Sequence, residues 1–215
     1  GIGDLLAEGM LGVIEKHPEW AAYICHVKGM PYAAYDPRGF YGNALTYGTS
    51  VRGACHNVGG WTIRDELQSG KYDRFALKGK GLLVQTIQDN RAYVDSLGIC
   101  TVVRGSMSYS AEPKGDTLES VTGYPFTDKL LEIGTRIYTL ERLILNREGR
   151  FRNDDQLPPR TVSEAVPDGP IAGRTLTKEM YNEMLDEYYD VRGWDRNGVP
   201  TGETVRKLGL QSLTA

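Results

Sequence analysis

The sequence predicts a mainly α-helical protein with several helices, and three observations favour this fold class. Apolar residues recur at intervals of three and four over long stretches, which places them on one face of a helix. Residues that commonly cap helices precede several of these stretches. Segments with strand character are few and short. At 215 residues, the chain is long enough for one or two domains with a sizeable core.

The first two predicted helices have clear boundaries. Residues 4–16 carry an amphipathic pattern that stops before Pro18, because proline disfavours the helical conformation in the residue before it. Asp36 and Pro37 are typical of an N-cap and a first helical position. The small-residue helix that they begin is predicted to extend to Ser50.

The middle of the chain is predicted to alternate between irregular and helical segments. Residues 57–78 contain several glycines and only one short expected helix, near 63–68. Residues 79–97 have helical composition, and Gly98 suits the left-handed residue that ends a helix. Another helix is expected to begin within residues 101–107.

The second half contains the strongest helical pattern, which runs from an N-cap at Thr127 to Gly149. A surface loop is predicted before it, at residues 108–117. The polar, proline-bearing residues 150–176 lack a long periodic pattern and are predicted to lie on the surface. Two further helices are predicted at residues 177–192, capped by Thr177, and near 203–208.

Charge and composition exclude several classes of function. The formal net charge of −3 gives no broad cationic field, so nucleic acid is not an expected partner. The chain has a mean hydropathy of −0.40 and no long apolar run, which predicts neither a membrane span nor a signal peptide. Its three cysteines form no C-x-x-C pair, which favours a reducing compartment over a disulfide scaffold. Because the sequence begins within a helical pattern and without Met, we expect a piece of a longer chain.

The segment from Tyr93 to Cys100 is the first candidate site, because it combines a carboxylate, a glycine and a thiol at a helix end. Asp95 would project from the last helical turn, and Cys100 would follow just beyond it. The structural alternative makes Asp95 a solvated acid, Gly98 a C-cap and Cys100 a small buried apolar residue. The sequence alone leaves both interpretations open.

His56 is the candidate catalytic residue, since a histidine near neutrality can take or give a proton beside a carbonyl substrate. It follows the helix predicted at 36–50, whose Gly42, Ala44 and Gly48 would let a ligand or another backbone approach. The alternative is a histidine hydrogen-bonded in a structural corner.

Other polar residues have weaker claims to function. Asp154 and Asp155 could imitate a metal-binding pair, although a loop ended by prolines explains them more simply. His17 and His26 are interpreted as surface or packing residues. The Tyr188, Tyr189 and Trp194 cluster is interpreted as packing. Four arginines could bind cofactor phosphates or form ion pairs on helix surfaces; they are Arg38, Arg52, Arg142 and Arg147.

Blocks of sequence spread from Gly3 to about Leu210 carry a family resemblance. In order and spacing, these blocks resemble the C-terminal part of the tungsten-containing aldehyde:ferredoxin oxidoreductase family. They are Tyr35-Asp36-Pro37-Arg38-Gly39, Gly42-Asn43-Ala44-Leu45, Thr49 to His56, Tyr93 to Cys100, Leu140-Glu141-Arg142, Asn146 to Gly149, Asp154 to Arg160, Met184 to Tyr189 and Arg192-Gly193-Trp194.

The resemblance implies two helical C-terminal domains of a larger multidomain enzyme. Residues 1–56 would be the end of the middle domain and the start of the last, and residues 57–215 the last domain. The family holds tungsten, or molybdenum, between two molybdopterins and also carries a 4Fe-4S cluster. Its pterin motif, Asp-x-x-Gly-Leu followed by Cys or Asp, is matched from Asp95 to Cys100 with one departure, Ile99 in place of Leu.

Roles for individual residues follow from the resemblance. Asp95 and Ile99 would contact a pterin, Cys100 would be one of four thiolate ligands of the cluster, and His56 would lie beside the metal and assist proton transfer. The closely spaced cysteines that supply the other three thiolates are absent from this sequence, as is the second pterin motif. The chain by itself is therefore expected to lack cofactor and activity.

The leading hypothesis is a tungsten oxidoreductase that converts small aldehydes to carboxylic acids. Its expected partners are the N-terminal domains of the parent chain, the aldehyde and ferredoxin as electron acceptor, with a homo-oligomer as an option. One alternative is a tungsten enzyme that acts reductively on an aromatic thioester or a carboxylic acid. Another is a non-catalytic helical scaffold or subunit-contact module.

Overall fold

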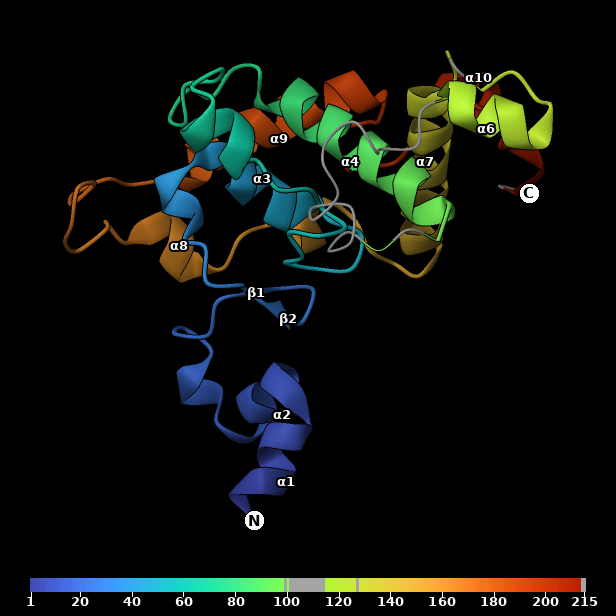
Figure 1. Cartoon of the computed structure of the whole chain (residues 1–215). Coiled ribbons are helices and arrows are strands. Elements are labelled where there is room, and N and C mark those ends of the chain that lie inside the picture. Colours follow the sequence, from blue (N-terminus) through green and yellow to red (C-terminus); the bar gives the residue numbers. More distant parts are fainter. Residues whose placement is uncertain (99, 101–114, 127, 214–215) are drawn as a thin grey trace.

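The computed structural model describes residues 1–98, 100, 115–126 and 128–213, and helices dominate it (Figure 1). The predicted mainly α-helical class is confirmed. Within the described residues, the sheet consists of one antiparallel hairpin. The α-helices are α1 Ile2–Ala7, α2 Gly9–Lys16, α3 Tyr41–Thr49, α4 Lys80–Ser96, α6 Gly115–Thr122, α7 Leu130–Arg147, α8 Pro159–Ser163, α9 Lys178–Arg192 and α10 Gly202–Lys207. The hairpin strands are β1 His26–Val27 and β2 Met30–Pro31. Short 3₁₀ turns occur at η1 Pro18–Trp20, η2 Pro37–Gly39, η5 Arg152–Asp155 and η6 Gln211–Leu213, and a π-helical turn at η3 Arg64–Gln68.

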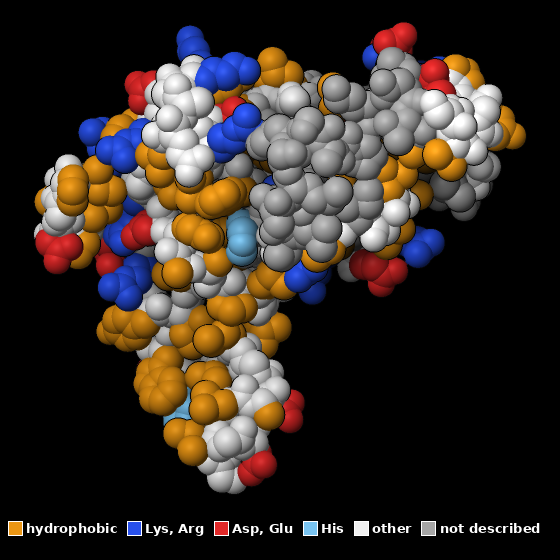
Figure 2. All heavy atoms as spheres, in the orientation of Figure 1, with side chains coloured by type: hydrophobic (Ala, Val, Ile, Leu, Met, Phe, Trp, Pro, Cys, Tyr) orange, Lys and Arg blue, Asp and Glu red, His pale blue; other side chains and the backbone are white. Residues whose placement is uncertain are grey.

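The N-terminal helices α1 and α2 project away from the rest of the molecule (Figure 1). The single helix predicted over 4–16 is two helices, because Gly9 has φ +73°, which a right-handed helix does not allow. Its predicted end before Pro18 is confirmed. Apolar side chains are visible along this projection (Figure 2), and Ile2 and Leu6 are among the most exposed of them.

Helix α3 lies at the centre of the fold, and all of its residues are buried. The single helix predicted from Asp36 to Ser50 is divided in two: the Asp36 side chain accepts a hydrogen bond from the Arg38 amide and caps the 3₁₀ turn η2, and α3 begins separately at Tyr41, after the extended Phe40. The small residues of α3 do allow close approach, but the neighbours are protein groups. A Cβ placed on Gly48 would lie 1.7 Å from the Tyr181 hydroxyl and 2.5 Å from the Asp155 carbonyl oxygen.

Helix α4 packs against both α7 and α9, and glycines allow two of the closest approaches. A Cβ on Gly134 of α7 would lie 2.0 Å from the backbone oxygen of Asp89 in α4. A Cβ on Gly81 of α4 would lie 2.8 Å from the backbone nitrogen of Tyr188 in α9. The Thr177 cap of α9 is confirmed, because its hydroxyl accepts from the Met180 amide.

One main core unites the body of the protein and includes residues from both sides of position 56. It contains Tyr188, Tyr189 and Trp194, which confirms their predicted packing role. A smaller cluster brings residues of α10 and the following turn against α7. The domain division at residue 56 stays a prediction.

Two sequence predictions need correction. The surface assignment of residues 150–176 is wrong for Asp155 and Leu176, both fully buried. The loop predicted over 108–117 cannot extend to its predicted end, because α6 begins at Gly115. The predicted cap Thr127 and the helix expected at 101–107 lie outside the described residues.

Candidate functional site

The last turn of α4 and the facing part of α7 border a cavity of about 260 Å³. Asp95 lines this cavity, as expected of a residue projecting from the helix end. The predicted helix stop is confirmed: Gly98 has φ +72°, and its amide donates to the Asp95 carbonyl at 3.0 Å. The lining residues are Val58, Ala92, Asp95, Ser96, Ile137, Tyr138 and Glu141.

The sequence did not point to Glu141 as a site residue, yet it lines the same cavity as Asp95. Burial raises the pKa of the Glu141 carboxyl, and the nearby Asp95 carboxylate raises it further, while Arg192 opposes the shift. The cavity thus contains an ionisable pair in which Glu141 holds its proton more firmly than an ordinary glutamate. Such a pair can accept and donate hydrogen bonds to the nitrogen-rich edge of a heterocycle.

The raised pKa of Glu141 gives a testable dependence of stability on pH. The folded state binds more protons at this site than the unfolded state, so the site reduces stability as pH rises from about 4.5 through the folded pKa. We expect the melting temperature to fall less between pH 5 and pH 8 in Glu141→Gln than in the wild type. Glu148→Gln, at an exposed position at the end of α7, is the control. If the melting temperature varied with pH in the same way in the wild type and in Glu141→Gln, the raised pKa of Glu141 would be contradicted.

Tyr138, another residue of the cavity wall, is fixed by buried polar contacts. Its hydroxyl donates to the Thr49 carbonyl at 3.0 Å, and the Arg192 guanidinium lies 4.4 Å from its ring centroid. Arg192 is itself buried in an ion pair with Asp89 and donates to Gln88 at 2.8 Å. The wall opposite Asp95 is therefore held in place by α3, α4 and α9 together.

His56 lies in the loop after α3 and is half-buried. Its ring meets Tyr35 edge-on, with centroids 5.3 Å apart. Burial lowers the pKa of His56, and the positive charge of Arg91 adds to this effect. The imidazole is thus biased toward its neutral form, which can accept a proton. His56 does not line the Asp95 cavity, but Val58, two residues further on, does, so the loop after α3 reaches the cavity wall at Val58.

The two remaining candidate residues are placed less completely. Ile99 lies outside the described residues, and Cys100 is exposed and does not line the Asp95 cavity. Within the described part of the chain, no three His, Cys, Asp or Glu side chains gather into a metal site. A metal at Cys100 would therefore need ligands from elsewhere. For a pterin, the fit is better, since the Asp95 and Glu141 carboxyls offer acceptors to its amino-pyrimidine edge.

Asp155 has a role that the sequence analysis missed. It is fully buried and accepts two hydrogen bonds from Arg142, at 3.0 and 2.8 Å, and one from the Tyr189 hydroxyl. The Lys28 ammonium, from the turn between β1 and β2, lies 2.7 Å from the same carboxylate. This Asp155 cluster is neither a metal site nor a surface loop but a buried ion network.

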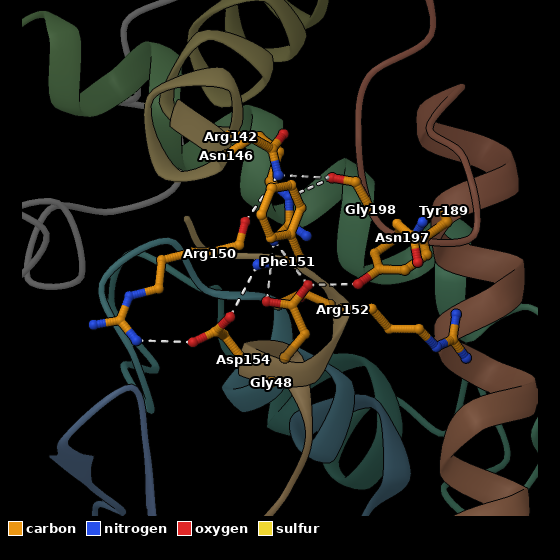
Figure 3. A network of polar contacts seen from close by, with 12 residues as sticks. Gly48, Arg142, Asn146, Arg150, Phe151, Arg152, Asp154, Tyr189, Asn197 and Gly198 are labelled. Carbon is orange, nitrogen blue, oxygen red and sulfur yellow. Dashed lines mark hydrogen bonds and ion pairs between the residues drawn. The ribbon is translucent and has the colours of Figure 1, made fainter. Parts of the chain in front are cut away.

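The surroundings of the Asp155 cluster connect α7 with the C-terminal segment (Figure 3). Arg142 and Asn146 both donate to the Gly198 carbonyl, at 2.6 and 3.4 Å. The neighbouring Asp154 plays a different part, since it accepts from the Phe151 amide and from Arg150. The adjacent aspartates are therefore not equivalent.

Most of the other polar candidates pair or pack with protein groups. The assignment of Arg142 to a phosphate or a surface ion pair is wrong, because its side chain is buried against Asp155. Arg147 lies beside Glu148 on the surface, as predicted, and Arg38 pairs with Asp36. Arg52 is exposed. His17 stacks on Trp20 with centroids 4.2 Å apart, and His26 accepts from the Gly29 amide, which agrees with their predicted packing roles.

No helix in the described part of the chain has the length and apolar character needed to cross a bilayer.

Comparison with known proteins gives consistent matches over the whole chain. The family described as "Aldehyde ferredoxin oxidoreductase, domains 2 & 3" matches residues 1–210. The tungsten-containing aldehyde ferredoxin oxidoreductase of Pyrococcus horikoshii is 35% identical over 218 residues, covering 99% of this chain and 35% of the relative. The enzyme of the same name from Pyrococcus furiosus is 36% identical, covering 98% and 34%. The chain thus spans about a third of the length of these curated relatives.

Two further similarities concern a second curated protein and a solved structure. The WOR-like subunit of an aliphatic sulfonate oxidoreductase from Pyrococcus furiosus is 30% identical, covering 98% of this chain and 32% of the subunit. Among solved structures, the active site complex BamBC of benzoyl coenzyme A reductase, with 1,5-dienoyl-CoA, superposes with a TM-score of 0.69 at 21% identity. That match covers 100% of this chain and 37% of the other, and it supports the fold alone.

Proposed function

Because the chain belongs to the aldehyde ferredoxin oxidoreductase family, we propose that it is the C-terminal helical part of a tungsten enzyme that oxidises small aldehydes to carboxylic acids. The observation that carries the proposal is the Asp95 cavity, where a carboxylate at the end of α4 lies across from Glu141 and next to the His56 loop. The remaining domains of the parent enzyme would close the site.

Asp95 is assigned to hold one edge of a pterin. Its carboxylate would accept N–H bonds from the amino-pyrimidine, and the Glu141 carboxyl, which lines the same cavity, would make a further hydrogen bond to that edge. Ile99 would contact the ring system from the segment beyond Gly98. When bound, the tungsten–pterin group supplies the oxidation chemistry at the aldehyde carbon.

His56 is assigned to proton transfer. Oxidation of an aldehyde takes an oxygen from water and releases two protons and two electrons. The half-buried imidazole, biased toward its neutral form, would accept one of those protons at a ring nitrogen. The edge-on contact with Tyr35 would hold the ring in position while it does so.

Cys100 is assigned as one thiolate of a 4Fe-4S cluster that passes the electrons singly to ferredoxin. Its exposed position in this chain leaves the thiol accessible to the other domains of the parent, which would supply the remaining ligands.

The proposal is tested by metal analysis of the full-length parent enzyme. We expect Asp95→Asn to lose most of the tungsten, and Cys100→Ser to lose iron, because each removes a group that holds the respective cofactor. Asp128→Asn, a change at an exposed aspartate outside the Asp95 cavity, serves as the control and should keep both metals. Full tungsten and iron in Asp95→Asn and Cys100→Ser would overturn the assigned roles. The same preparations are assayed for aldehyde oxidation and for reduction of a benzoyl thioester, which separates the oxidative from the reductive alternative.

A further inference from the structure

We propose that a second cavity, beside Tyr35, is the pocket that receives the aldehyde, and that Tyr35 determines which aldehydes reach His56. This inference rests on the proposed function. The cavity has a volume of about 380 Å³, within the range of about 300–1,000 Å³ that is typical of small-molecule sites. It is bordered by the segment 32–38, by Cys25 and by Arg160 and Thr161 at the start of α8.

Tyr35 is the residue that the cavity and the His56 environment share. It lines the cavity, and its ring centroid lies 5.3 Å from that of His56 and 5.9 Å from that of Trp61. His56 does not itself line the cavity, so Tyr35 is the contact through which the cavity adjoins the imidazole. Replacing Tyr35 by alanine would remove this shared contact.

The charged residues of the wall are already paired, which favours an uncharged ligand. The Asp36 carboxylate and the Arg38 guanidinium are 2.6 Å apart, and Arg38 also donates to the Glu164 carbonyl at 3.1 Å. Arg160 pairs with the Glu164 side chain at 2.8 Å. A charged ligand would have to compete with these partners, whereas a neutral aldehyde would not.

The rest of the wall suits an apolar body. Tyr32 and Tyr35 present aromatic rings, and Ala33, Ala34 and Pro37 add aliphatic surface. The Tyr32 ring stacks on Tyr47 with centroids 4.7 Å apart, and its hydroxyl lies 3.1 Å from the Thr161 hydroxyl. These contacts fix the wall before a ligand arrives, so the cavity is suited to a neutral aldehyde with an aromatic or short aliphatic body.

Kinetics of the full-length enzyme test the role of Tyr35. We compare kcat/KM for a bulky aldehyde with kcat/KM for acetaldehyde. Tyr35→Ala is expected to raise the ratio of these two values by about tenfold, which is a typical effect of one changed pocket contact. Tyr35→Phe should keep the wild-type ratio, because the ring remains. Tyr23→Ala is the control, since Tyr23 is exposed and does not line the cavity. An unchanged ratio in an active Tyr35→Ala enzyme would overturn the inference.

Protection of Cys25 tests the pocket without relying on catalysis. Cys25 is partly exposed and lines the cavity, so its alkylation by iodoacetamide, followed by mass spectrometry, reports whether the cavity is filled. In the full-length enzyme, benzyl alcohol should slow this alkylation severalfold, and benzoate, of similar size but charged, should not. Equal rates with and without benzyl alcohol would overturn the pocket assignment. Protection by benzyl alcohol in an enzyme that oxidises no aldehyde would uphold the pocket and overturn only the proposed reaction.

Discussion

Replacement of Asp155 by asparagine is expected to lower the free energy of unfolding by about 3–5 kcal/mol, which is the usual cost of breaking a buried ion pair from one side. The Asp155 carboxylate is fully buried, and the side chains of Lys28 and Arg142 are 6% and 1% exposed. Burial already lowers the pKa of Lys28, and Asp155 is the main group that opposes this. Without the carboxylate, two buried cations would lose the ion-pair partner that they share.

Urea denaturation of wild type and Asp155→Asn, followed by circular dichroism, measures this loss. Asp154→Asn is the matched control, because Asp154 is adjacent in sequence but pairs with the half-exposed Arg150. Partly exposed pairs of this kind contribute about 0–1 kcal/mol. If the two variants lost the same stability, the Asp155 cluster would not have the importance that its burial indicates.

Gly134→Ala is expected to destabilise the protein by about 1–3 kcal/mol, because the added methyl group overpacks the crossing of α7 and α4. The new Cβ would lie 2.0 Å from the backbone oxygen of Asp89 and 2.6 Å from its carbonyl carbon. Backbone atoms cannot rotate away as a flexible side chain can, so the helices must separate. That separation would also disturb the Arg192–Asp89 ion pair.

Thermal unfolding compares Gly134→Ala with Gly3→Ala. Gly3 is also helical, but a Cβ there meets nothing within 4 Å. Alanine in an open helical position normally gains about 0.5–1 kcal/mol over glycine. The two substitutions should therefore shift the melting temperature in opposite directions. A stabilised Gly134→Ala would show that the helices adjust at no cost.

The helices could be predicted from the sequence because their causes are local. Thr177 caps α9, Asp36 caps η2, and Gly98 ends α4 through contacts within a few residues, which a sequence pattern records directly. The break between α1 and α2 was missed because the helical periodicity continues across Gly9, while the backbone does not. Contacts between distant segments leave no such pattern. Nothing near Asp155 in the sequence indicates that Lys28 and Tyr189 are its partners.

The candidate site was predicted in part, for the same reason. The position of Asp95 at the end of α4 followed from local helix chemistry, and the structure places it at a cavity. Glu141 was missed as a site residue because the apolar residues spaced at three and four positions along α7 indicate only that the helix packs against the core. Its approach to Asp95 depends on how α7 crosses α4, a crossing set by Gly134 and the Asp89 backbone. The role of Cys100 depends on groups outside this chain and stays a prediction.

The hairpin that delivers Lys28 to Asp155 bears on the order in which the chain folds. Helices such as α4 and α9 can form from neighbouring residues, whereas the Asp155 carboxylate is matched only when the hairpin, α7 and α9 have all docked. Until then the carboxylate of Asp155 stays hydrated, because burying it before its partners arrive would cost free energy. A chain whose hairpin is misdocked would keep the Arg142 and Tyr189 contacts of Asp155 but lack the Lys28 ion pair, so this carboxylate links the docking of the hairpin to that of α7 and α9.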